Sequence, residues 1–180
     1  LLWDDEEAAL EEFRRAIELE PDWDHPRLWL ASFLYDRGEV DESIAELEVI
    51  LERDPENNVA LNNLCSRLAF SGRYEEAIPR LHEAISLYPE DASFHVILGY
   101  VYYYVERYED SASEYEEACR LSPAWAALRN LLGSAYLKLR EYEKAREQFE
   151  KAKELSKPGE DDYKRAEENL QNLKSLTDEG

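Results

Sequence analysis

Residues 92–125 read ASFHVILGYVYYYVERYEDSASEYEEACRLSPAW, and this stretch decides the fold because its landmark residues recur along the chain. Its one proline, Pro123, belongs to a series with a step of 34 residues, and small and large apolar residues recur in the same order before each proline. A period of 34 with this order of residues is typical of a repeated pair of helices. The series is Pro21, Pro55, Pro89 and Pro123, and Pro158 follows one residue late.

When the repeats are aligned, three columns of equivalent positions show the same period of 34 residues. Small side chains allow two helix backbones to approach closely, and steps of three and four residues place the apolar positions on one stripe of a helix. The columns are Ala9, Ser43, Ala77, Ser111 and Ala145; Phe13, Leu47, Leu81, Tyr115 and Phe149; and Leu30-Ala31, Leu64-Cys65, Leu98-Gly99 and Leu132-Gly133.

The pattern predicts two helices in each repeat. Gly38 and Gly72 would end first helices, and each proline would begin the turn to the next repeat. We expect Asp24, Asn57 or Asn58, and Asp91 to be N-caps. The predicted helices are 5–20, 25–37, 41–53, 59–71, 75–87, 93–105, 109–121, 126–139, 143–155 and 160–176.

The chain resembles the tetratricopeptide repeat family at these positions. The family pattern is met in part by His95-x-x-Leu98-Gly99-x-x-Tyr102 with Ser111, Tyr115 and Pro123, and by Leu132-Gly133-x-x-Tyr136 with Ala145 and Phe149. Tyr74, Tyr108 and Tyr142 match its aromatic residue after the turn between helices. The departures are Arg27, Leu61, His95 and Arg129 in a column that favours tryptophan, and the displaced Pro158.

The resemblance implies an all-α, right-handed superhelical solenoid of antiparallel helix pairs. It would form a single domain over 1–180. The parts are a half repeat with only its second helix (1–23), full repeats at 24–57, 58–91, 92–125 and 126–159, and a capping helix at 160–177. At the N-terminal end, Leu1, Leu2 and Trp3 are apolar where a stack needs a polar surface. We therefore expect either missing upstream residues or another molecule on this end, with self-association as one outcome.

Composition excludes several classes of protein. The chain has 42 Asp and Glu against 21 Lys and Arg, a net charge of −21, which opposes nucleic-acid binding. No stretch is long and apolar enough for membrane insertion, and the acidic N-terminus is unlike a signal peptide. A cytoplasmic location is the default expectation. The absence of methionine, even at position 1, predicts a processed, trimmed or engineered chain.

The sequence offers little catalytic or metal-binding chemistry. His25, His82 and His95 lack a second ligand at metal-site spacing. Asp91 and Ser93 stand where a helix cap is needed, so we do not interpret them with His95 as a catalytic triad. Cys65 and Cys119 are expected to be buried thiols. We predict no enzyme, no metal site and no cofactor.

Family resemblance assigns the inner wall of the superhelix to the first helices of the repeats. Tyr100, Tyr103 and Tyr104 would form its aromatic centre, because tyrosine offers a large contact area and one hydrogen bond at little entropic cost. The alternative is that these rings only pack between neighbouring helices. The predicted groove comprises Tyr35, Asn62, Asn63, Ser66, Phe70, Val96, Tyr100, Tyr103, Tyr104, Asn130, Leu137 and Lys138.

The predicted function is a protein-interaction scaffold that binds a peptide or protein segment in this groove. The carboxylate clamp known in the family also needs lysine and arginine, and only Asn63 matches it here. The rival prediction is a structural or self-assembling module, natural or engineered, with no groove ligand. The first helices of the full repeats carry a net charge of +3, so the acid lies mainly on the second helices, turns and cap. We therefore expect groove binding to depend only weakly on salt.

Overall fold

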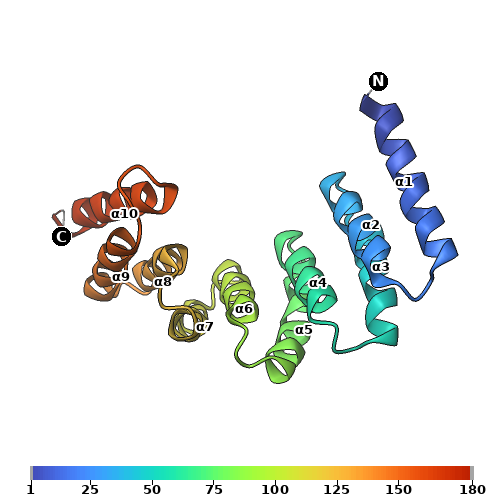
Figure 1. Ribbon diagram of the computed structural model, residues 1–180. Helices are drawn as coiled ribbons and strands as arrows, with labels where there is room; N and C mark the ends of the chain where they lie inside the picture. The colour runs from blue at the N-terminus through green and yellow to red at the C-terminus, as the bar shows by residue number, and fades with distance from the viewer. Residues whose placement is uncertain (1, 179–180) are drawn as a thin grey trace. The chain divides into compact units, whose positions relative to one another are not determined.

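The computed structural model describes the backbone of residues 2–178 and the side chains of residues 6–177. This part of the chain consists of ten α-helices joined by short turns, with no strand, so the predicted all-α class is correct (Figure 1). The helices are α1 (Leu2–Leu19), α2 (Asp24–Asp36), α3 (Val40–Arg53), α4 (Asn58–Phe70), α5 (Tyr74–Leu87), α6 (Ala92–Tyr104), α7 (Tyr108–Leu121), α8 (Ala126–Lys138), α9 (Tyr142–Leu155) and α10 (Asp161–Asp178).

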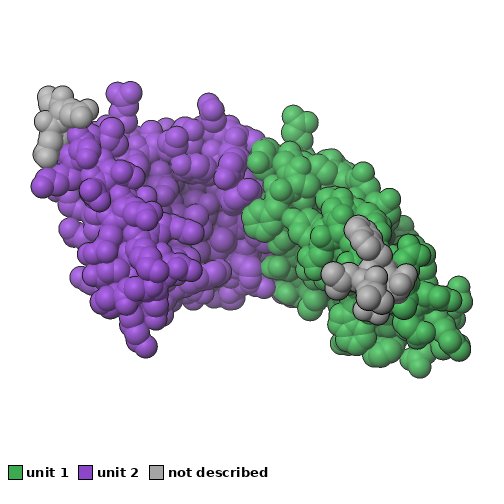
Figure 2. All heavy atoms as spheres, turned by 90° about the horizontal axis from the view of Figure 1, so that it is seen from above, with its two compact units in different colours: residues 1–76 green, residues 77–180 purple. Residues whose placement is uncertain are grey.

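The helices form two compact units, residues 1–76 and residues 77–180, with the boundary inside α5 (Figure 2). Each unit is described separately below. The prediction that residues 1–180 form a single solenoid stays a prediction.

Unit 1 is built around the helix pair of α2 and α3. Ala31 and Leu47, from the small and the large apolar columns, are completely buried. The Ser43 hydroxyl donates a hydrogen bond of 2.5 Å to the Ala31 carbonyl oxygen, which links the two helices through their small columns. α1 packs on α2, and α4 packs on α3, so consecutive helices are neighbours within this unit.

Unit 2 repeats this arrangement in the pairs α6–α7 and α8–α9. The Ser111 hydroxyl donates to the Gly99 carbonyl oxygen at 2.8 Å, as Ser43 does in unit 1. The glycines are required here, because a Cβ atom at Gly99 would lie 2.7 Å from the Tyr115 ring, and one at Gly133 would lie closer still to the Phe149 ring. α10 packs on α8 and α9 and buries Ala166 and Leu173, while its remaining surface is largely charged.

The turn inside each repeat needs a residue in the left-handed region. Gly38 (φ 82°) and Gly72 (φ 80°) supply it, as predicted. The equivalent positions in unit 2 hold Glu106 (φ 62°) and Arg140 (φ 59°), so the fold imposes the same turn there on side chains that rarely adopt it. The repeat register therefore sets this turn even where the residue disfavours it.

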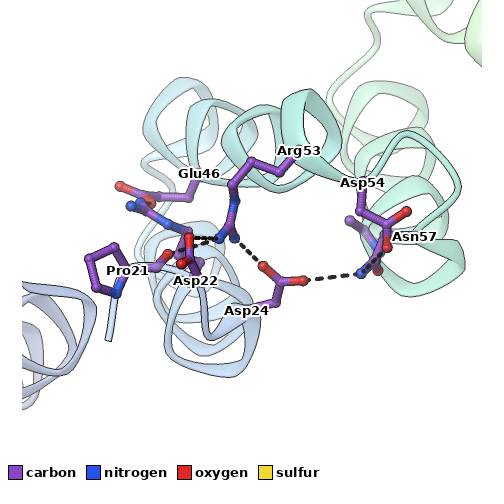
Figure 3. Close-up of polar contacts among 9 residues, drawn as sticks. Pro21, Asp22, Asp24, Glu46, Arg53, Asp54 and Asn57 are labelled. Atoms are coloured by element: carbon purple, nitrogen blue, oxygen red, sulfur yellow. Dashed lines mark hydrogen bonds and ion pairs between the residues drawn. The ribbon is translucent and has the colours of Figure 1, made fainter. Parts of the chain in front are cut away.

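Two of the predicted N-caps are confirmed and one is wrong. The Asn57 side chain accepts from the Ala60 amide, and the Asp91 side chain accepts from the Ser93 amide. At α2 the N-cap is Trp23, without a side-chain cap bond, and Asp24 lies in the first turn. Asp24 instead forms an ion pair with Arg53 and accepts from the Asn57 amide group (Figure 3). The carboxylate thus serves a tertiary network, which its local sequence position could not reveal.

α1 has the residue pattern of a second helix, but its columns are less buried than in the full repeats. Ala9, Phe13 and Ala16 are partly exposed, whereas their equivalents in α3, α7 and α9 are buried. The side chains of Leu1, Leu2 and Trp3, which prompted the expectation of an apolar N-terminal end, lie outside the described residues. The finding that α1 is less buried than the equivalent helices therefore rests on Ala9, Phe13 and Ala16 alone.

Candidate functional site

Four tyrosines and one lysine form a continuous cluster in unit 2. The Tyr100 and Tyr104 ring centroids are 4.5 Å apart, and the Tyr103 ring lies 5.8 Å from Tyr104 and 5.4 Å from Tyr108 in edge-to-face geometry. The Lys138 ammonium lies 6.0 Å from the Tyr103 ring centroid and 5.9 Å from that of Tyr108. α6, α7 and α8 all contribute to this cluster, which we call the tyrosine cluster.

The members of the tyrosine cluster differ in accessibility. Tyr104 is 55% exposed and Tyr100 is half-buried, whereas Tyr103 packs against the core of unit 2. Burial, together with the neighbouring Tyr108 and Tyr104, raises the pKa of the Tyr103 hydroxyl. Tyr103 therefore lies between the core of unit 2 and the other rings, and Tyr100 and Tyr104 form the outer surface of the cluster.

The other groove residues predicted in unit 2 are less uniform. Val96 and Leu137 are half-buried and pack against the same core, and Lys138 is exposed. Asn130 is only 1% exposed, and its side-chain amide donates to the Asp162 carbonyl oxygen at 3.0 Å. Asn130 thus joins α8 to α10 and is inaccessible to a ligand in this structure.

The residues predicted in unit 1 surround a buried arginine that the sequence interpretation missed. Arg67 is 7% exposed, and its guanidinium donates to Ser43 at 2.8 Å, to the Asn63 side-chain oxygen at 2.9 Å and to Ser32 at 3.2 Å. It also lies 4.9 Å from the Tyr35 ring centroid. Burial lowers the pKa of Arg67, while Tyr35 and Asp36 act in the opposite direction. These contacts make up the Arg67 network.

The Arg67 network accounts for two of the predicted groove residues. Tyr35 and Asn63 are half-buried and engaged by the guanidinium, so they already have structural roles. Asn62 and Ser66 are also half-buried, and Phe70 is 55% exposed. The sequence did contain a signal that Arg67 is buried, because the equivalent positions in the other repeats hold the apolar residues Phe33, Val101 and Ala135. A charged side chain at a buried position needs polar neighbours, which predicts a network such as this one.

In the column where the family favours tryptophan, three of the four residues form polar pairs between the two helices of a repeat, and the fourth, Leu61, is buried. Arg27 pairs with Glu46 at 2.6 Å, the His95 ring contacts Glu114 at 2.7 Å, and Arg129 donates to Gln148 at 3.1 Å. His95 is thus engaged by Glu114, while the Ser93 hydroxyl donates to Asp91 within the helix cap. This geometry supports the interpretation of Asp91 and Ser93 as capping residues.

Metal ligands and membrane-spanning helices would be further kinds of site. The described residues contain no group of three or more histidine, cysteine, aspartate or glutamate side chains that could hold a metal ion. Cys65 and Cys119 are both buried, as expected, and burial raises the pKa of the Cys119 thiol. None of the helices in the described part of the chain has the length and apolar character needed to cross a membrane.

Comparisons with known proteins identify the repeat. One family model described as tetratricopeptide repeat matches residues 66–124 and 98–160, and another of the same description matches residues 4–68. No curated protein matches the chain.

Solved structures give the same answer about the fold. A MamA fragment from Desulfovibrio magneticus RS-1 is 23% identical, with a TM-score of 0.75, over 83% of this chain and 85% of that chain. TTC0263, a thermophilic TPR protein of Thermus thermophilus, is 22% identical with a TM-score of 0.75, over 94% of this chain and 93% of that one. YrrB, described as a TPR protein with an unusual peptide-binding site, is 21% identical with a TM-score of 0.71, over 94% and 85%.

Proposed function

Because the chain belongs to the tetratricopeptide repeat family, whose members are protein-interaction scaffolds and typically non-catalytic, we propose that it binds a peptide or protein segment on the inner faces of its first helices. The observation that carries this proposal is the outer surface of the tyrosine cluster. Tyr104 is 55% exposed and lies beside the half-buried Tyr100. Exposed tyrosines on a rigid helix suit recognition, because little side-chain freedom is lost on binding.

The groove residues divide into ligand contacts and supports. In unit 2, Tyr100, Tyr104 and Lys138 are the ligand contacts, and Tyr103, Val96 and Leu137 hold them on the core. In unit 1, Phe70 is the exposed aromatic residue, and Asn62 and Ser66 are its polar neighbours on α4. Asparagine can donate to and accept from a peptide backbone at the same time, which suits an extended ligand.

A test needs a ligand, which a phage-displayed random peptide library can supply. Peptides selected on the full chain would be measured by fluorescence anisotropy against the Tyr100→Ala/Tyr104→Ala variant. We expect affinity to fall about tenfold or more, as for truncation of aromatic interface anchors. Trp125→Ala is the matched control, because Trp125 is 47% exposed but lies in the turn before α8. Binding that survives the double substitution would refute the groove.

Salt dependence gives a second test of the same proposal. The first helices of the full repeats have a net charge of +3 in a chain of −21, so the groove is nearly neutral. Raising the ionic strength should therefore weaken peptide binding only slightly. A steep loss of affinity with salt would mean that the ligand binds on the acidic surface instead.

A second candidate function, a self-assembling module, is favoured by α1. The partial exposure of Ala9, Phe13 and Ala16 leaves an apolar stripe on this helix. Light scattering over a range of concentrations would show a rising mass if α1 mediates association, and Ala9→Glu should abolish the rise. A constant monomeric mass would rule this function out.

A further inference from the structure

The turn between α1 and α2 and the first part of α2 carry an exposed aromatic cluster. The ring centroids of Trp23 and His25 lie 5.7 Å apart, and Trp29 lies 6.1 Å from each of them. The Trp29 plane stands at 77° to that of Trp23 and at 67° to that of His25. Trp23 is 44% exposed and Trp29 is 52% exposed, so about half of each residue remains open to solvent. We call these three residues the tryptophan cluster.

The surroundings of the tryptophan cluster are acidic. Residues 18–24 contain four Asp and Glu residues, and no lysine or arginine stands between Arg15 and Arg27. Glu20 and Asp22 line a hollow of about 420 Å³ together with Pro21 and Trp23. The Asp22 side chain is 99% exposed. Negative charge is therefore available at the edge of the aromatic surface.

Nearby arginines neutralise only part of this charge. Arg53 donates to the Pro21 carbonyl oxygen at 3.0 Å and to the Asp22 carboxylate at 3.2 Å, and it pairs with Asp24 (Figure 3). Arg27 is engaged by Glu46. Within the described residues, Glu20 takes part in no ion pair. Arg53 thus holds the turn in place, while the Glu20 carboxylate stays unneutralised.

The equivalent turn in unit 2 lacks these features. Residues 20–25 read Glu-Pro-Asp-Trp-Asp-His, and residues 122–127 read Ser-Pro-Ala-Trp-Ala-Ala. Trp125 is the N-cap of α8, as Trp23 is of α2, and it is 47% exposed. No ring contact involves Trp125 in the described part of the chain, and no charged residue stands between Arg120 and Arg129. The helical repeat therefore forms this turn without a second tryptophan, a histidine or carboxylates.

We propose that the tryptophan cluster binds a lysine or arginine side chain from a basic segment of a partner protein. The face of tryptophan attracts cations more strongly than that of any other side chain, and the adjacent carboxylates add direct Coulomb attraction. Residues 1–56 contain nineteen Asp and Glu against five Arg, so the field around this end also favours the approach of a basic ligand. This site lies at the N-terminal end of α2 and in the turn before it, and it does not depend on the peptide groove of the proposed function.

The test uses a fluorescein-labelled lysine-containing peptide and the same peptide with glutamine in place of each lysine. Anisotropy with the full chain should detect binding of the lysine peptide only. Trp23→Ala/Trp29→Ala should weaken it about tenfold, as expected for the loss of two cation–π contacts. Trp125→Ala is the matched control and should leave the affinity unchanged, because it removes a tryptophan of similar exposure from the equivalent turn.

Further variants separate the aromatic and acidic parts of the site. Trp29→Leu keeps an apolar side chain but loses the π face, so it should also weaken binding. Glu20→Gln leaves the aromatic residues and the contacts of Asp22 with Arg53 intact and should lower the affinity about twofold. This variant tests the site even if the tryptophan double variant fails to fold. Equal binding of the glutamine peptide, or lysine-peptide binding that is unchanged by Trp23→Ala/Trp29→Ala, would overturn the proposal.

Discussion

Unit 1 and unit 2 use the same repeat positions for different chemistry. On α4 of unit 1, one position of the first helix carries the buried Arg67, which binds Ser32, Ser43 and Asn63. On α6 of unit 2 the same position carries the completely buried Val101, and the helix presents the tyrosine cluster. Each unit nevertheless forms antiparallel helix pairs with a serine hydroxyl bonded to the first helix.

The difference indicates which positions the helical repeat constrains. The small columns and the left-handed turn are needed wherever two helices pair, because backbones approach closely there. The inner positions beside them accept either a satisfied polar network or packed aromatic rings. A surface of varied chemistry can therefore be placed on a constant framework, which suits a family of binding scaffolds.

The largest expected effect concerns the Arg67 network. Arg67→Ala should lower the free energy of unfolding by about 3 kcal/mol, because it removes several buried hydrogen bonds and leaves a cavity. Arg67→Leu should cost less than half as much, since equivalent positions hold Phe33 and Val101. Urea unfolding followed by circular dichroism measures both. A cost below about 1 kcal/mol for the alanine variant would show that the network does not stabilise unit 1.

The next effect concerns the small column of unit 2. Gly133→Ala should destabilise the chain by about 2 kcal/mol, because overpacking against Phe149 outweighs the better helix propensity of alanine. The matched variant is Gly133→Ala/Phe149→Leu, which recreates the Ala31 and Leu47 pair of unit 1. A double-mutant cycle should give a favourable coupling of about 1 kcal/mol. Strict additivity would mean that the glycine is not there to accommodate the ring.

Alkaline pH should also distinguish the two units. Burial raises the pKa of Tyr115, and burial with the Glu116 hydrogen bond raises that of Tyr136; both lie in unit 2. A raised pKa means that the folded chain holds the proton more tightly, so stability is full below about pH 10 and falls as the pH rises further.

Above about pH 10, we expect the free energy of unfolding to fall by about 1 kcal/mol per pH unit for each of these two hydroxyls. Urea unfolding at several alkaline pH values, with tyrosine ionisation followed by absorbance, measures the loss. Tyr136→Phe should reduce it. A stability that is flat across this range would contradict the burial of these hydroxyls.

The smallest effects separate supports from ligand contacts within the tyrosine cluster. Tyr103→Leu should lower the stability by about 1 kcal/mol, because it removes the contacts with Tyr104 and Tyr108. Tyr104→Leu should cost less than about 0.5 kcal/mol, since the ring is 55% exposed. Thermal melting of the two variants tests this order. The reverse order would assign the supporting role to Tyr104.

Much of the fold could be predicted because the repeat pattern is local and redundant. All ten helices were predicted within three residues of their observed ends, and Gly38 and Gly72 end first helices as expected. Asp24 was misassigned as an N-cap because the sequence did not reveal its tertiary partner, Arg53. The candidate site was harder to predict, because periodicity indicates on which face of a helix a residue lies but not how deeply its side chain is buried. Asn130 lies on the predicted face, yet α10 covers it.

The sequence by itself determined the helices, their pairing register and the positions where small residues must stand, because a fixed step of 34 residues repeats those requirements. Only the tertiary structure decided which inner residues are exposed. It buried Arg67 and Asn130 and left Tyr104 accessible, and it brought Trp23, His25 and Trp29 together at the N-terminal end of α2. The physical reason is that burial and ring contacts depend on neighbouring helices, whose side chains a single column of the repeat does not specify.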